Sequence, residues 1–190
     1  MGRTRDVRKI LTSNTSILSL ASASTTYATK AAAGLTLLNT TTFSGVSSVS
    51  LPANTFNSTY DNYSIVASFV GSITDQNVRA RMRAAGTDNT TASSYVRQRL
   101  YFTSTTSTPN TATDTFWDTG VITDTITSYQ VELFDPFLAS ATAFASRGGA
   151  RNQMLSATGY HTQATSYDSF TFYPSSGTLT GKYSVFGFNK

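Results

Sequence analysis

The chain has 190 residues, a formal net charge of +4 and no cysteine, and only 13% of its residues are charged. This length suffices for one domain with a sizeable core. The absence of cysteine excludes disulfides, thiolate metal sites and a cysteine nucleophile. Without a run of about 18 apolar residues, we expect no membrane insertion. Roughly a third of the residues are Ser or Thr, and Val, Ile, Tyr and Phe are plentiful, which favours an all-β protein.

Residues 1–42 differ from the rest of the chain because they have no core pattern. A basic cluster opens the segment and is followed by a few apolar residues at helix-like spacing; together these are Arg3, Arg5, Val7, Arg8, Lys9, Ile10 and Leu11. Such a cluster can bind nucleic acid or an acidic protein surface, or it can simply keep a tail soluble. Polar residues interrupt the following apolar stretch, so we expect no signal peptide. We predict an extended or short-helical docking arm and linker that orders against a partner.

From Phe43 onward, short apolar or alternating segments are separated by turn residues at spacings of about 8–15 residues, which is typical of strands in a β-sandwich. The segment 63–72 is almost continuously apolar, which is typical of a strand that is buried on both faces or that crosses the core. We therefore predict that residues 43–190 form one antiparallel β-sandwich, jelly-roll-like in type. The ten expected strands cover 43–51, 63–72, 78–84, 95–102, 115–124, 128–136, 141–146, 152–161, 168–174 and 181–188.

Five arginines occupy alternating positions in two of these strands. They are Arg79, Arg81, Arg83, Arg97 and Arg99. Side chains alternate between the faces of a strand, so each row shares one face, and the two rows lie side by side if the strands pair as a hairpin. Like charges in adjacent rows repel unless negative charge meets them. The candidate internal partners are Asp75, Asp88, Asp135 and Glu132. A neighbouring subunit or an anionic ligand would also serve, and a solvated face with local ion pairs is the simpler alternative.

Catalytic patterns are weak. His161 is the one histidine of the chain, and no second metal ligand lies at a suitable spacing from it, so we expect no metal. The sequence also has no glycine-rich loop of the kind that binds phosphate groups, so we expect no cofactor. A triad could be drawn from Ser166, His161 and Asp168, but a hydroxyl-rich sequence offers many such sets. A sugar-cleaving pair could be drawn from the aspartates near Trp117, which are Asp114, Asp118 and Asp124. Aspartates at strand ends and turns are the commoner explanation, and we expect no enzyme.

Several stretches together resemble a β-rich domain of structural proteins of tailed phages, notably those that infect cyanobacteria. They are the opening "SSVSL" and "TYDNYSIV", then "RAAGTD" and "DPF", and the closing "TSYDSFTFYPSSGTLTGKYSVFGFNK". The N-terminal "MGRTRDVRKILTSNTSILSL" followed by "ASTTYATKAAAGLT" resembles the docking arm and linker of phage fibre proteins. The resemblance covers most of the chain, but its motifs are structural rather than catalytic.

The resemblance implies a non-enzymatic virion protein, assembled in the bacterial cytoplasm, whose arm docks on other virion proteins and whose β head is displayed. It also implies a closed homo-oligomer, most often a trimer. Sequence-reading modules for nucleic acid are absent from the sequence, so we expect no specific nucleic acid as a partner. A tail-fibre or adsorption-type component would contact a host surface glycan. The alternatives are a capsid decoration or head-fibre protein and, in a different class, a stand-alone carbohydrate-binding or carbohydrate-active domain.

Overall fold

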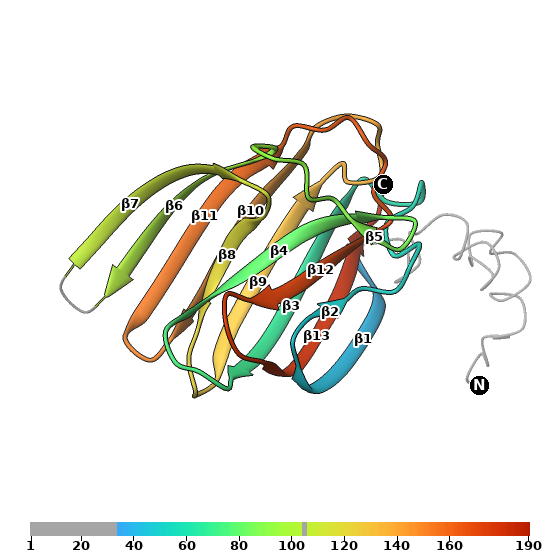
Figure 1. Cartoon of the computed structure of the whole chain (residues 1–190). Coiled ribbons are helices and arrows are strands. Elements are labelled where there is room, and N and C mark those ends of the chain that lie inside the picture. Colours follow the sequence, from blue (N-terminus) through green and yellow to red (C-terminus); the bar gives the residue numbers. More distant parts are fainter. Residues whose placement is uncertain (1–33, 104–105) are drawn as a thin grey trace, which may run out of the picture. The chain divides into compact units, whose positions relative to one another are not determined.

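The computed structural model describes residues 34–103 and 106–190. Within these ranges all regular elements are strands, so no helix is present there that could cross a membrane. The strands form two antiparallel sheets that pack face to face (Figure 1). The predicted fold class, an antiparallel β-sandwich, is confirmed.

The large sheet has eight strands in the order β1-β13-β3-β9-β10-β11-β6-β7. All its neighbouring pairs are antiparallel, and the β1–β13 pair contains irregularities in register. The bounds are β1 (Leu35–Val46), β3 (Asn62–Gly71), β6 (Tyr95–Thr103), β7 (Thr106–Asp114), β9 (Thr127–Phe134), β10 (Thr142–Ala150), β11 (Gln153–His161) and β13 (Leu179–Phe188).

The small sheet has the order β2-β12-β4, with both β5 and β8 paired to β4. Strand β8 contacts β10 and β11 of the large sheet, and β6 lies next along that sheet (Figure 1). The bounds are β2 (Val49–Ser50), β4 (Gln76–Ala84), β5 (Thr87–Asp88), β8 (Trp117–Ile122) and β12 (Ser169–Pro174).

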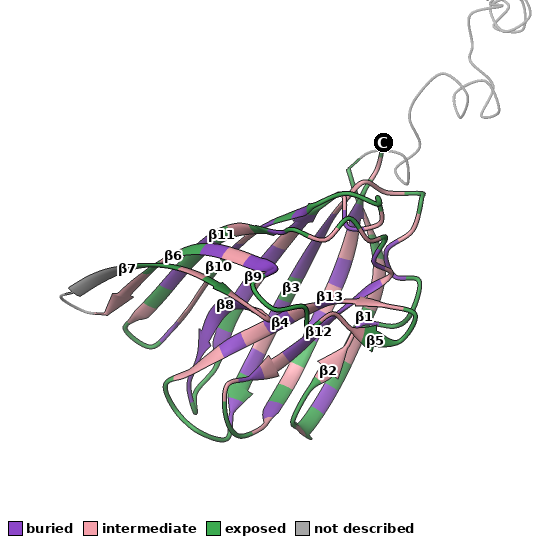
Figure 2. Ribbon diagram, turned by 45° about the horizontal axis from the view of Figure 1, so that its top comes forward, coloured by how far each residue is buried: buried purple, intermediate pink, exposed green. Residues whose placement is uncertain are grey.

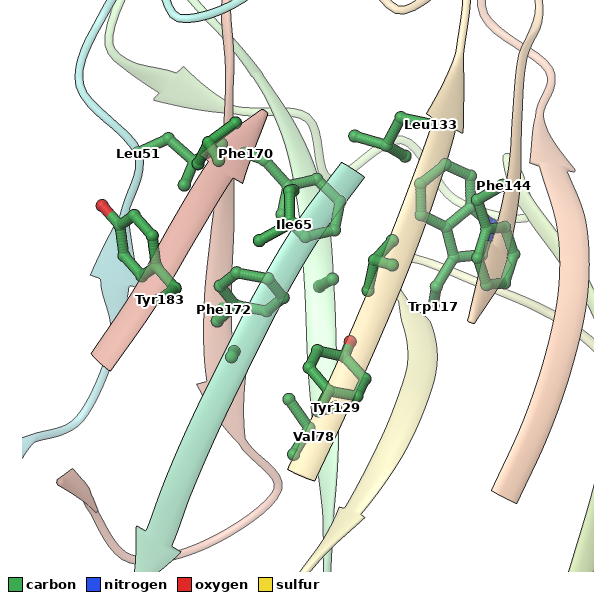
Figure 3. Close-up of a cluster of buried hydrophobic side chains, with 14 of the residues drawn as sticks. Leu51, Ile65, Val78, Trp117, Tyr129, Leu133, Phe144, Phe170, Phe172 and Tyr183 are labelled. Atoms are coloured by element: carbon green, nitrogen blue, oxygen red, sulfur yellow. The ribbon is translucent and has the colours of Figure 1, made fainter. Parts of the chain in front are cut away.

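The core lies between the two sheets and follows the period-two pattern of the strands. In β9, for example, Tyr129, Val131 and Leu133 are buried while the residues between them are more exposed (Figure 2). Trp117 sits among aromatic rings, with its ring centroid 4.3 Å from that of Phe144 (Figure 3). Aromatic side chains bury the largest apolar areas, so this layer supplies much of the burial that stabilises the sandwich.

Three features depart from the sequence-based expectation. Strand β1 begins at Leu35, so the boundary predicted at residue 43 falls inside that strand. Strand β7, over Thr106–Asp114, was not expected, because its Thr-rich segment contains Pro109 and no apolar alternation. Strand β3 is buried on one face only, since Val66 and Val70 on its other face are 47% and 37% exposed.

Candidate functional site

The five arginines, called here the arginine cluster, come from two different sheets. The three on β4 project from the outer face of the small sheet, because the intervening Val78, Ala80 and Met82 fill the core. Arg97 and Arg99 lie on the inner face of the large sheet, the same face as the buried start of β6. The hairpin suggested for these two strands does not form: β4 pairs with β12, β5 and β8, whereas β6 pairs with β11 and β7.

One carboxylate joins the two rows. Asp118 of β8 lies opposite Arg79 in the β4–β8 register, beside a bulge, and its Oδ1 is 3.3 Å from the Arg79 Nε. Its Oδ2 is 2.8 Å from Arg97 Nη2 and 3.4 Å from Arg99 Nη1. The Asp118 and Arg97 side chains are only 5% and 6% exposed. A charge buried this deeply is tolerated because it is paired and hydrogen-bonded.

Aromatic rings lie against three of the five guanidinium groups. The Arg79 Cζ lies 4.1 Å from the centroid of the Phe116 ring, and the Arg97 Cζ lies 5.6 Å from the same centroid. The Tyr173 ring packs edge-on against the Phe116 ring, and the Arg81 Cζ lies 4.9 Å from the centroid of the Tyr173 ring. The negative face of an aromatic ring attracts a cation, so these contacts help to offset the repulsion among the arginines.

The other two arginines of the cluster do not contact Asp118. The Arg83 Nη1 donates to Asp88 Oδ1 at 2.8 Å, and the Thr171 hydroxyl donates to the same oxygen at 2.7 Å. The Arg81 Nε donates to the carbonyl of Thr115 at 3.0 Å. Among the described residues, no carboxylate lies within 4.0 Å of Arg81. This guanidinium is therefore held in place by neutral groups.

The cluster carries a surplus of positive charge. Its five guanidiniums meet three described carboxylates within 4.0 Å, those of Asp88, Asp114 and Asp118, which leaves a net +2. The pairing with Asp114 is loose, at 3.7 Å from Arg97. Guanidinium groups fixed in this way present N–H donors that suit carboxylate, sulfate or phosphate oxygens. The arrangement can hold an anion; it also serves to lock the edge of the small sheet to the large sheet.

Only one of the four acidic partners expected from the sequence is used. Asp88 pairs with the cluster, whereas Asp75 and Glu132 accept hydrogen bonds from glutamine side chains and Asp135 occupies a turn with a φ of 55°. The sequence pattern marked Asp118, the carboxylate that contacts three of the five arginines, only as a catalytic candidate. Its signal was present in the sequence as an acidic residue inside a predicted strand, next to Trp117, because a charge that is buried needs a cationic partner.

His161 is completely buried and both of its ring nitrogens have partners. Its Nδ1 lies 3.1 Å from the carbonyl of Ser94 and its Nε2 lies 2.6 Å from the Tyr167 hydroxyl. A carbonyl only accepts, so Nδ1 carries the proton and Nε2 accepts from the tyrosine. Burial lowers the pKa of His161 to about 4, although the bond to Ser94 opposes this shift. The ring nitrogens therefore bond to groups other than Ser166 and Asp168, and the suggested triad is not assembled.

The three aspartates near the tryptophan do not converge on one open site either. Asp118 is covered by arginines, Asp114 accepts a hydrogen bond from the backbone of the next residue, and Asp124 pairs with Arg151. Within residues 34–103 and 106–190, no group of three His, Asp or Glu side chains is placed to hold a metal ion.

Residues 1–33 of the predicted arm and linker lie outside the described residues, and they include the seven named positions: Arg3, Arg5, Val7, Arg8, Lys9, Ile10 and Leu11. Most of the remainder, from residue 35 to residue 42, belongs to strand β1. Comparison of the chain with family models, curated proteins and solved structures finds no match.

Proposed function

We propose that the chain is a non-enzymatic structural protein of a tailed-phage virion, of the tail-fibre or adsorption type. The segment before the sandwich docks on other virion proteins, and the sandwich is displayed as part of a homo-oligomer, a trimer in the simplest case. Support comes from the phage-like stretches spread along the sequence. It also comes from the way candidate catalytic groups are held: His161 and Asp118 are both buried in structural contacts.

The observation that carries the adsorption role is the arginine cluster with its net +2 charge. Its guanidiniums are pre-positioned by Asp118 and by the rings of Phe116 and Tyr173, so little side-chain freedom is lost when an anion binds. Arg81 is the cluster member whose charge no described carboxylate neutralises. The ligand class is an anionic glycan of the host surface, such as a phosphorylated lipopolysaccharide.

An adsorption competition tests this function. Purified chain is added in excess to susceptible cells before the phage, and free phage is counted after a fixed time. We expect reduced adsorption at low salt and a much weaker effect at about 0.5 M NaCl, where screening removes contacts between exposed charges. Arg81→Gln should compete poorly, while Arg147→Gln, a matched change in an exposed arginine of the large sheet, should compete like the wild type.

A folded chain that leaves phage adsorption unchanged would contradict the adsorption role. If the same chain co-purified with capsids, a head decoration or head-fibre role would replace it. Equal competition by the wild type and by Arg81→Gln would show that the arginine cluster does not bind the host ligand.

A further inference from the structure

The two outer faces of the sandwich differ sharply in composition. The small sheet presents the β4 arginines of the cluster, whereas the large sheet presents apolar side chains. Twelve large hydrophobic residues are exposed in the described chain, and only Ile73, Ile126 and Leu138 of these lie in loops. The other nine occupy outward positions on six strands of the large sheet: Leu35, Leu37, Val66, Val70, Leu100, Phe134, Met154, Tyr160 and Phe188.

The outer face of the large sheet also carries little charge. Its charged residues, among those described, are Glu132, Arg147 and Lys182. The first two are linked through Gln130, whose Oε1 accepts from Arg147 Nη2 at 2.8 Å and whose Nε2 donates to Glu132 Oε1 at 3.2 Å. The charges of Glu132 and Arg147 thus offset each other and Lys182 leaves a net +1, so copies of this face can meet without strong repulsion between like charges.

Strand β3 has the composition of a strand that is covered on both faces. Antiparallel strands with one solvated face normally alternate apolar and polar residues. In β3 the inward residues Ile65 and Phe69 are buried, yet the outward Val66 and Val70 are apolar too and 47% and 37% exposed. The segment therefore fits an assembly in which a partner covers the outer face better than it fits an isolated sandwich.

The face is large enough for a stable interface. The sheet is eight strands wide, with about 4.8 Å between strands, and each strand has roughly nine residues with a rise of about 3.3 Å per residue. Width times length gives a face of about 1,100 Å². A standard specific interface needs about 800 Å² on each partner. The face is also hollowed between Val66 and Met154, where Gly149 has no side chain, so it can receive a protruding side chain.

We infer that the outer face of the large sheet is a self-association surface, covered in the assembled protein by a second copy of this chain. A strongly charged partner is disfavoured, because this face has no cluster of opposite charge to bind it. A second copy brings the same apolar side chains and the same offset charges, as at homo-oligomer interfaces. The inference does not depend on a virion location, because it rests on this sheet face alone.

Sedimentation velocity of the full-length chain over a dilution series tests the inference. Leu100→Glu and Val66→Glu introduce a charge on the face, and Leu138→Glu introduces the same charge in the β9–β10 loop, where the leucine is 51% exposed. Trp117 fluorescence checks that each variant is folded. We expect the wild type to be oligomeric. The protein concentration at which half of it dissociates should rise at least tenfold in each face variant and should stay unchanged in Leu138→Glu.

A monomeric wild type at about 100 μM, a range in which even weak specific complexes form, would overturn the inference. Oligomers that persist unchanged in both folded face variants would overturn it as well, since association would then use another surface. Neither result bears on whether the protein belongs to a virion, which the adsorption and particle experiments address separately.

Discussion

Replacing Asp118 with asparagine removes the one negative charge shared by Arg79, Arg97 and Arg99 while keeping the size of the side chain. The Arg97 side chain is only 6% exposed, so its charge would stay buried with Asp114 as the remaining carboxylate, 3.7 Å away. Breaking a buried pair by removing one partner costs about 3–5 kcal/mol. The amide oxygen still accepts a hydrogen bond, so we expect a loss of about 3 kcal/mol, or roughly 6–12 °C in Tm for a domain of this size.

Urea unfolding followed by Trp117 fluorescence measures this loss, because Trp117 is the one tryptophan of the chain and lies in the core. Asp114→Asn is the matched control: that side chain is 35% exposed, so its loss should cost less than about 1 kcal/mol. A cost under 1 kcal/mol for Asp118→Asn, or equal costs for the two variants, would refute the assignment of Asp118 as the carboxylate that holds the cluster together.

Three further predictions follow from other parts of the chain. The pKa of His161 is about 4 in the folded protein and about 6.5 when unfolded, so the unfolded state binds more protons below pH 6.5. Stability should therefore fall by about 3 kcal/mol as the pH drops from 6.5 to 4, and urea titrations of His161→Gln should lack this slope. In Gly181→Ala, the new Cβ would lie 2.0 Å from the backbone oxygen of Ser68, so the melting temperature should fall steeply; a shift below 2 °C would contradict this close approach. Deleting residues 2–11 should abolish incorporation into particles without changing the Tm of the sandwich, and a normal copy number in particles would contradict the docking role of the arm.

The sandwich could be predicted from the sequence because its strands carry the expected alternation. Residues of β4 and β9 switch between buried apolar and outward polar positions, and turn residues separate the strands. Strand β7 could not be predicted in the same way. Among the strands that the structure describes, it pairs with β6 alone and so forms an edge of the large sheet, and an edge position tolerates the Pro109 that would disrupt a central strand.

The arginine cluster was only partly predictable. Alternation correctly put each arginine row on one face of its strand, but pairing partners are set by the tertiary fold, and the two rows belong to different sheets. The link through Asp118 depends on β8 lying between β4 and the nearby β6, a contact between residues far apart in the sequence. The apolar outer positions of β3 gave the expectation of a strand covered on both faces. In the single chain only one of its faces is covered.

The most direct test of the proposed function is to locate the chain on particles. Particles are purified on a density gradient from lysed cells that produce the chain, and are labelled with gold-conjugated antibodies raised against the folded sandwich. The proposal predicts that the chain co-sediments with intact particles and that gold lies on the tail fibres. Recovery of the chain only in the soluble fraction, with unlabelled particles, would contradict a virion role.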